Sequence, residues 1–134
     1  MNTSTTDRPS APTAKMGASG LKAALNILEK WGCNAEQMQA ILRLPRATFY
    51  KYRSHPESAR LDQDQLTRIS YLLNIHQALR IVFDNPDNVY GFMTKRNHNA
   101  YFHGRAPLDV IGNGDFAALY ETFKRVDHLR SGLW

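Results

Sequence analysis

The chain has a single cysteine, Cys33, among its 134 residues. One thiol cannot form an internal disulfide, and no second cysteine stands beside it at the spacing of a metal site. Because a chain without disulfides is typical of a reducing compartment, we expect a cytoplasmic protein. Cys33 follows Trp31 closely, so we interpret it as a small apolar side chain of the core.

Long hydrophobic runs are also missing. No stretch approaches the roughly 20 apolar residues that a membrane-spanning helix needs. The first residues, 1–18, are rich in Ser, Thr, Pro and Ala and contain no apolar core of a signal peptide. Their composition predicts a disordered arm.

Acidic residues are scarce in the first half of the chain only. Residues 1–60 contain nine Lys or Arg and four Asp or Glu, whereas residues 61–134 contain eight of each. The whole excess of positive charge, +5 at pH 7, therefore lies in the first half. This distribution favours a polyanion as the partner of the first half and a different partner for the second.

Apolar residues recur at helical spacing in 21–31 and stop at Gly32, which predicts an amphipathic helix. Asn34 is a good N-cap for a short helix over 35–42. After the tight link at 43–44, we expect a third helix from Arg46 to about Ser54. Residues 55–61 break the pattern and are expected to form a loop.

The second half shows helical spacing as well, beginning at Asp62. The pattern allows one long helix there, or two that bend near Asn74. Asp115 is the expected cap of the last helix. The expected apolar stripe of that helix is Phe116, Leu119, Tyr120, Phe123 and Val126.

No strand-like alternation and no repeat is present, so the sequence predicts an all-α fold. The expected parts are the arm 1–18, a helix-turn-helix domain 19–60, and a helical domain 61–134. The last of these includes shorter helices near 86–94 and 107–111.

Two short helices with a tight turn and a basic second helix indicate a helix-turn-helix. In such a motif one face of the second helix packs on the first two helices, and the other lies in the major groove of DNA. Phe49 and Tyr52 are the expected buried pair. The candidate DNA-binding residues are the remaining polar and aromatic ones, Arg46, Thr48, Tyr50, Lys51 and Arg53.

Arg46, at the start of that helix, suits a bidentate contact to guanine, and Thr48 suits a thymine methyl. Lys51 and Arg53 suit bases or phosphates. The alternative is a solvated basic face without a partner. Tyr50 favours DNA binding, because an aromatic side chain among cations is unusual on an inert surface.

Several segments, in this order, resemble the Xre/MbcA/ParS family of antitoxins. They are LRLPRATFYKYR (42–53), RISYLLNI (68–75), LRIVFDNP (79–86), FMTKRN (92–97) and FHGRAPLDVI (102–111). The resemblance covers roughly 20–134. Phe92 stands where family members often have tryptophan, and the loop 97–103 is longer than usual.

The resemblance implies an antitoxin that inhibits a RES-type toxin, an enzyme similar to ADP-ribosyltransferases that consumes NAD. It also implies a homodimer that represses its own operon by binding operator DNA, and a hetero-oligomer with the toxin. We expect no enzymatic activity and no cofactor. The residues alone indicate only a basic DNA reader joined to a neutral interaction domain.

The last five residues are RSGLW (130–134), in which Gly132 is expected to end the last helix. A terminal tryptophan is a large apolar anchor of the kind that dominates interfaces. We predict that Arg130, Leu133 and Trp134 bind the toxin and cover its active-site cleft. The alternative is that Trp134 folds back onto its own domain.

Two other functions stay open from the sequence. One is a stand-alone dimeric repressor whose second domain dimerises or senses a ligand. The other is a small enzyme, although no catalytic set appears. His98 and His103 are polar loop residues and not a metal site, because zinc-binding helical pairs stand four apart and need further ligands.

Overall fold

The computed structural model describes residues 11–132, and this part of the chain is helical without any strand. The predicted all-α fold is therefore confirmed. The elements are α1 (Ala11–Lys30), α2 (Ala35–Leu42), α3 (Arg46–Ser54), the 3-10 turn η2 (Pro56–Ser58), α4 (Gln63–Val82), α5 (Pro86–Gly91), the 3-10 turn η3 (Phe92–Thr94), α6 (Pro107–Ile111) and α7 (Phe116–Arg130).

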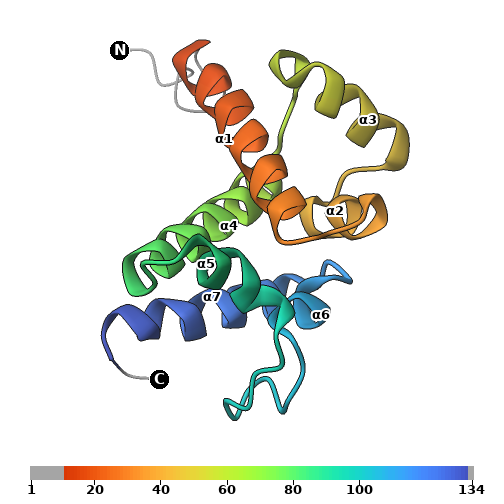
Figure 1. Ribbon diagram of the computed structural model, residues 1–134. Helices are drawn as coiled ribbons and strands as arrows, with labels where there is room; N and C mark the ends of the chain where they lie inside the picture. The colour runs from red at the N-terminus through yellow and green to blue at the C-terminus, as the bar shows by residue number, and fades with distance from the viewer. Residues whose placement is uncertain (1–10, 133–134) are drawn as a thin grey trace, which may run out of the picture.

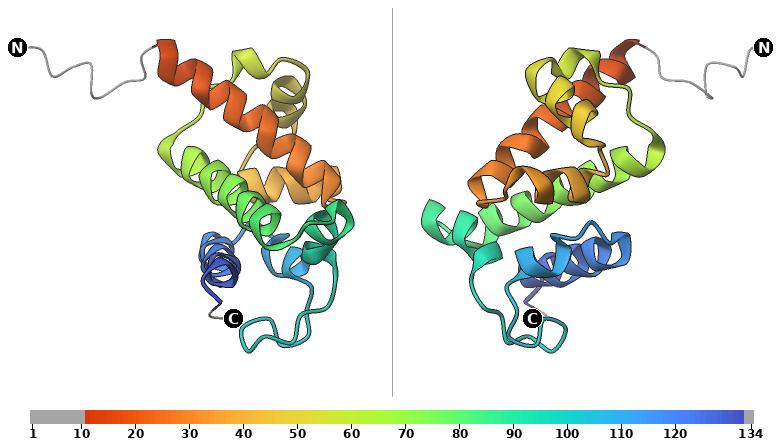
Figure 2. Two further views of the ribbon diagram at one scale, coloured as in Figure 1. Left: turned by 60° about the vertical axis from the view of Figure 1, so that its left-hand side comes forward. Right: turned by 90° about the vertical axis from the view of Figure 1, so that its right-hand side faces the viewer.

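Helix α4 occupies the centre of the molecule. Helices α1, α2 and α3 lie on one side of it and α7 on the other, as Figure 1 shows. Because helices cover both of these sides of α4, its side chains Leu72, Ile75 and Leu79 are fully buried. The further views place α1 against one side of α4 and α7 against the other (Figure 2).

The helix starts agree with the capping residues read from the sequence. Asn34 and Asp62 each form a capping box, in which a glutamine three residues on returns the hydrogen bond. Asp115 accepts from the backbone N–H of Ala118 at 3.1 Å. Because α4 is continuous from Gln63 to Val82, the alternative with two helices bending near Asn74 is wrong.

Helix α1 begins ten residues before the expected start at Leu21. Residues 11–18 are thus helical, and the expectation of disorder for them is wrong; residues 1–10 lie outside the described part. The reason is contact with α4. A Cβ added at Gly17 would lie 3.6 Å from Leu66, and one at Gly20 would lie 3.4 Å from Ile69. The small residues let the first turns of α1 pack closely on α4.

The hydrophobic core runs across the predicted boundary at residue 60. Trp31 and Phe49 from the first half belong to the same buried cluster as Leu72 and Val126 from the second. A smaller cluster surrounds Phe102 in the loop region. The division into 19–60 and 61–134 stays a prediction about function, while the packing joins the two halves.

The apolar stripe expected on the last helix divides into two parts. Leu119 and Val126 are buried, whereas Phe116 and Tyr120 are more than a third exposed, so only part of the predicted stripe belongs to the core. The seam between α4 and α7 is filled by Leu119, Val126 and the small side chain of Thr122. Phe116 and Tyr120 lie over the ring of Tyr71 instead.

Candidate nucleic-acid interface

The turn between α2 and α3 is held by backbone hydrogen bonds. Arg43 adopts a left-handed conformation, with φ 56°, and its N–H donates to the Ala40 carbonyl at 3.2 Å. The N–H of Leu44 donates to the Gln39 carbonyl at 2.9 Å. These bonds satisfy the last carbonyls of α2 and let α3 start only four residues later.

Helix α3 packs through the two residues predicted for its inner face. Phe49 is fully buried and Tyr52 nearly so. The Tyr52 hydroxyl accepts from the Arg60 N–H at 2.9 Å, which attaches the segment after α3 to the helix. With its inner face fixed in this way, α3 presents the opposite face to solvent.

The outward side chains are Arg46, Tyr50, Lys51 and Arg53, all of which are exposed. Arg46, Tyr50 and Arg53 follow one another at spacings of four and three, so they share one face of the helix. The Arg46 guanidinium lies 5.7 Å from the centre of the Tyr50 ring. Thr48 is half-buried, so its proposed contact with a thymine methyl stays a prediction.

Arg53 has partners within the protein. Its guanidinium lies 3.4 Å from the Glu29 carboxylate of α1 and 5.8 Å from the centre of the Phe49 ring. This pair partly compensates the charge of Arg53. Lys51 is exposed on the same helix and carries the more accessible charge.

Two arginines that the sequence analysis did not single out fix the turn to α4. Arg43 pairs with Asp62 and Asp64 at the start of α4, and its Nε lies 2.6 Å from the Asp64 carboxylate. Hydrogen bonds from Arg43 lower the pKa of both aspartates below the usual range. The second arginine, Arg68, is buried and donates to the Ile41 carbonyl of α2 at 3.1 Å.

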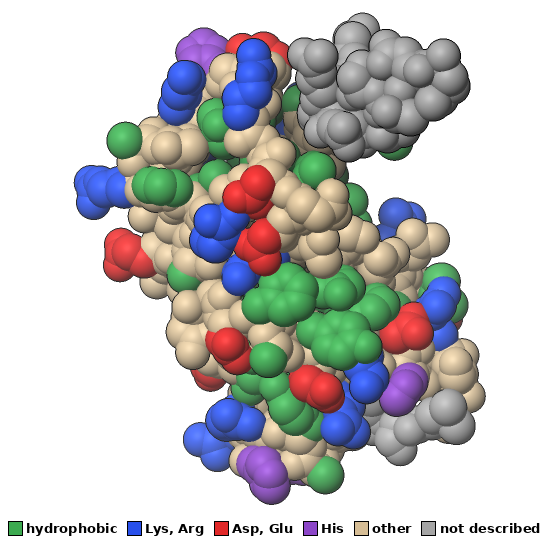
Figure 3. Space-filling model, turned by 180° about the vertical axis from the view of Figure 1, so that it is seen from behind, with side chains coloured by type: hydrophobic (Ala, Val, Ile, Leu, Met, Phe, Trp, Pro, Cys, Tyr) green, Lys and Arg blue, Asp and Glu red, His purple; other side chains and the backbone are tan. Residues whose placement is uncertain are grey.

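An exposed aromatic surface lies on the side of α4 opposite α1. We use this name for Tyr71, Phe116, Tyr120 and Phe123. The Tyr71 ring stacks on Phe123 with centres 5.0 Å apart and lies 5.6 Å from Tyr120. Figure 3 shows hydrophobic side chains gathered on this face. Phe116 and Tyr120 are 38% and 39% exposed, and aromatic groups of this kind are enriched at protein interfaces.

Comparison with known proteins agrees with the geometry of α2 and α3. Residues 11–74 match the model of the antitoxin Xre-like helix-turn-helix domain. The chain is also 30% identical over 125 residues to the uncharacterized protein y4oB of Sinorhizobium fredii (strain NBRC 101917 / NGR234), covering 92% of this chain and 93% of that protein. This chain belongs to the Xre-type antitoxin family. No solved structure matches it.

The antitoxin is thus a DNA-binding regulator of the toxin–antitoxin kind, with α2 and α3 as its helix-turn-helix. The match extends beyond residue 60 to residue 74, so it includes the first half of α4. This agrees with the structure, in which Arg43 and Arg68 attach the helix-turn-helix to that half of α4.

The predicted toxin-binding residues are only partly within the described chain. Arg130 is at the last turn of α7, where its guanidinium lies 2.7 Å from the Asp127 carboxylate. Leu133 and Trp134 lie outside the described residues. Arg130 is on the same helix as Phe116, Tyr120 and Phe123, three residues of the predicted apolar stripe.

Two further features, a metal-binding cluster and a membrane-spanning helix, are absent between residues 11 and 132. No three His, Cys, Asp or Glu side chains in this part are grouped to hold a metal ion. None of its helices is long and apolar enough to cross a membrane.

Proposed function

We propose that this chain is the antitoxin of a type II toxin–antitoxin system with a RES-type, NAD-consuming toxin. It binds the toxin through its second half and represses its own operon through α3. The proposal adds the toxin class to the family assignment, and the resemblance of the run from Asp62 to Trp134 to the toxin-binding domain of these antitoxins supports it. Regulation without catalysis is typical of the family.

One observation carries the proposal: two different surfaces lie on opposite sides of α4. The basic outer face of α3 suits the phosphate backbone and the major groove. The aromatic surface of α4 and α7 has little use in DNA binding, since its residues are apolar and α7 lies away from α3 (Figure 1). An aromatic surface of this kind suits a protein partner, and the experiment below separates a toxin from a second copy of the chain in that role.

We infer that the toxin contacts the aromatic surface and the end of α7 together. Tyr120 and Phe123 lie on the same helix as Arg130, and Leu133 and Trp134 follow in the chain. Aromatic and arginine side chains contribute most to protein interfaces, and here Phe123 and Arg130 line one hollow. In this arrangement Leu133 and Trp134 reach the active-site cleft while the aromatic surface supplies the main contact.

The deciding experiment is co-purification of the tagged antitoxin with the product of its adjacent gene. Cellular NAD is assayed in parallel. We expect a stable complex and an undiminished NAD pool, and deletion of residues 132–134 should restore NAD loss. Tyr50→Ala is the matched control, since a change on α3 should leave both readouts unaltered.

Two results would contradict the proposal. Absence of a complex, or a complex in which NAD is still lost, leaves a stand-alone repressor as the function. If the complex forms and the deletion has no effect on NAD, the role of Leu133 and Trp134 is wrong while the antitoxin function stands.

A further inference from the structure

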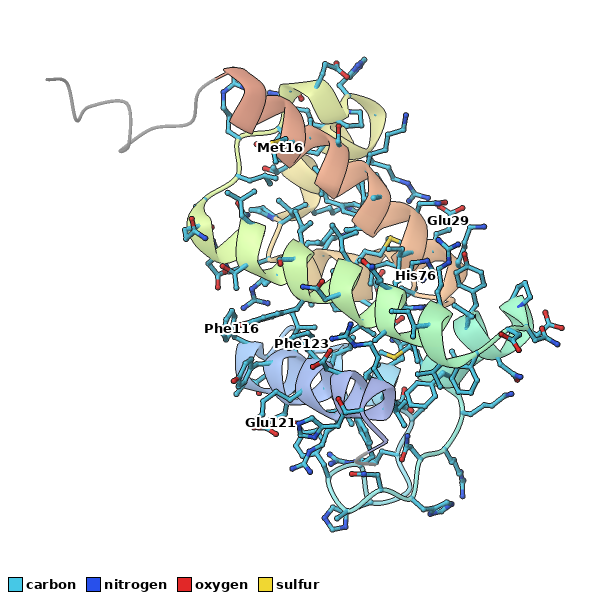
Figure 4. All side chains as sticks on the ribbon, turned by 90° about the vertical axis from the view of Figure 1, so that its left-hand side faces the viewer. Met16, Glu29, His76, Phe116, Glu121 and Phe123 are labelled. Atoms are coloured by element: carbon cyan, nitrogen blue, oxygen red, sulfur yellow. The ribbon has the colours of Figure 1, made fainter. Side chains whose placement is uncertain are left out.

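A group of basic side chains lies where the end of α1 meets the second half of α4. We call Lys30, His76 and Arg80 the basic cluster; they surround the ring of Tyr90 in α5. The Lys30 ammonium nitrogen is 5.2 Å from the centre of that ring, and the His76 ring stacks on it with centres 5.4 Å apart. Figure 4 shows Glu29, the neighbour of Lys30 in the chain, and His76 toward the C-terminal ends of α1 and α4.

Arg80 completes the basic cluster from α4. It lines a hollow of about 700 Å³ together with His76, and a neighbouring hollow together with Tyr90. The pKa of His76 is lowered, first by burial and then by the positive charges of Arg80 and Lys30. Two different helices therefore direct their charges to the same place.

The two permanent charges of the basic cluster are not compensated within the protein. Lys30 and Arg80 are both exposed, and neither forms an ion pair with a carboxylate in residues 11–132. Glu29 pairs with Arg53 instead, and Asp84 lines the hollow beside Arg80 without reaching ion-pair distance. Because cations held near one another repel, an anion that binds beside both of them is favoured.

The basic cluster adjoins the outer face of α3. Arg53 of that face contacts Glu29 at 3.4 Å, and Lys30 is the next residue of α1. The views agree that the end of α1 lies between α3 and α5 (Figures 1 and 2). The positive surface of α3 thus continues past the end of α1 to the basic cluster.

Backbone phosphates of DNA fit this position. Lys and Arg contacts to phosphates supply much of the affinity of DNA-binding proteins, and they lie beside the helix that reads the bases. No member of the basic cluster lines the hollow beside Phe123 and Arg130, so the proposed toxin contacts remain free.

We propose that Lys30 and Arg80 form a second DNA contact, which binds backbone phosphates next to the segment that α3 reads. The inference rests on the proposed function in one respect: it takes α3 as the helix in the major groove. Phosphates carry no base sequence, so this contact adds affinity and orientation but no sequence preference.

The first test measures the salt dependence of binding to a duplex from the promoter of its own gene. Lys30→Ala and Arg80→Ala should each lower the slope of log affinity against log salt by about 0.9, the value for one phosphate contact in B-DNA. The double variant should show both losses. Lys30→Arg and Arg80→Lys keep the charge and should bind as the wild type does. Lys124→Ala on α7 is the matched control, and circular dichroism confirms that each variant folds.

The second test changes affinity in the opposite direction. Asp84 is exposed beside Arg80, so its carboxylate repels a phosphate bound there. Asp84→Asn should therefore raise the affinity for the promoter duplex. Glu121→Gln removes a charge of the same sign on α7 and should leave affinity unaltered.

The third test locates the phosphates by ethylation interference. Ethylation removes the charge of single phosphates, and those bound by the basic cluster should weaken the wild type when modified. The Lys30→Ala, Arg80→Ala double variant should be insensitive to these phosphates and as sensitive as the wild type to all others.

Three results would overturn the inference: an unchanged salt slope in the double variant, an identical ethylation pattern for double variant and wild type, or no gain in affinity from Asp84→Asn. Each leaves the proposed function standing, provided that the wild type binds promoter DNA. A wild type that binds no promoter DNA would overturn both operator repression and this inference. Toxin inhibition is measured separately by the NAD assay.

Discussion

Arg68 donates a hydrogen bond from Nη1 to the carbonyl of Gly114 at 2.7 Å, although 46 residues separate them in the chain. The same nitrogen donates to the Ile41 carbonyl at 3.1 Å, and Nε donates to Asp64 at 3.0 Å. The guanidinium also lies 5.5 Å from the centre of the Phe116 ring. One buried side chain thus joins the end of α2, the start of α4 and the loop before α7, and it contacts the aromatic surface.

Replacing Arg68 should therefore destabilise the whole fold. Arg68→Met keeps the length of the side chain but leaves the Ile41 and Gly114 carbonyls without this donor, and each such loss costs about 1–3 kcal/mol. We expect the free energy of unfolding to fall by about 2–4 kcal/mol in urea titrations.

Arg125→Met is the matched control. Arg125 is partly exposed and pairs with Glu121 one turn away at 3.7 Å, and such surface pairs contribute about 0–1 kcal/mol. Equal losses for the two variants would show that the buried contacts of Arg68 add nothing.

Gly114 is the partner of Arg68 and has no room for a side chain. Its φ is +82°, and an added Cβ would collide with the backbone carbonyl of Ala40, lying 2.7 Å from the carbonyl carbon. Gly114→Ala should thus force the loop before α7 away from α2 and lower stability by about 2–4 kcal/mol, measured by thermal or urea unfolding.

Gly132→Ala separates the cost of the left-handed backbone conformation from the cost of the steric clash. Gly132 also has a positive φ, +72°, but an added Cβ would meet nothing within 4 Å. The left-handed conformation alone costs roughly 1–2 kcal/mol. If Gly114→Ala is no more destabilising than Gly132→Ala, the close approach of Gly114 to Ala40 is not a constraint.

Whether a feature could be predicted from the sequence depends on how far apart in the chain its interacting residues are. Asn34, Asp62 and Asp115 cap helices by contacts three residues away, so their roles could be predicted from local sequence. The inner face of α3, Phe49 and Tyr52, was likewise predictable from spacing and from the motif.

The roles of Arg43 and Arg68 depend on partners 19 to 46 residues away, and nothing in the local pattern indicates them. The helical start of α1 depends in the same way on Leu66 and Ile69 of α4. Periodicity predicts the apolar stripe that includes Phe116 and Tyr120, but it does not say how much of that stripe a neighbouring element covers. The exposed part of that stripe belongs to the aromatic surface.

The ion pairs of Arg43 should make stability depend on pH in the acidic range. The pKa values of Asp62 and Asp64 are lowered in the folded state, chiefly by hydrogen bonds from Arg43. A lowered carboxyl pKa stabilises the fold above the unfolded value, about 3.9, and the contribution is lost as pH falls through the folded value.

We therefore expect Arg43→Gln to reduce the decline in stability between about pH 5 and pH 2. Urea titrations at several pH values measure the difference between variant and wild type. An unchanged pH dependence would mean that these exposed pairs are screened by solvent. Gln65 still donates to the carbonyl of residue 43 in this variant, since that bond uses the backbone.

DNA binding should depend on α3 in a graded way. Lys51→Ala should reduce operator affinity and lower the slope of log affinity against log salt by about one, the value for one lost phosphate contact. Arg53→Ala should have a smaller effect on the slope, because Glu29 already compensates part of its charge. Fluorescence anisotropy at a series of salt concentrations measures both.

Arg46→Ala should instead relax sequence preference, since a bidentate contact to guanine contributes about 1–3 kcal/mol of discrimination. Lys124→Ala, a change of equal charge on α7, is the control and should leave affinity and slope unaltered. If Lys51→Ala and Arg53→Ala both bind as the wild type does, α3 is not the reading helix.

The aromatic surface provides the complementary prediction for toxin binding. Tyr120 is exposed, packs near Tyr71 and lies under the Lys124 ammonium, whose nitrogen is 5.4 Å from the ring centre. Tyr120→Arg places a second cation beside Lys124 in a region that a partner would desolvate, so toxin affinity should fall at least tenfold, or about 1.4 kcal/mol. Isothermal titration calorimetry with an inactive toxin measures this change. Operator affinity should stay the same, because α7 lies across α4 from α3. A variant that loses DNA affinity and keeps toxin affinity would reverse the assignment of the two surfaces.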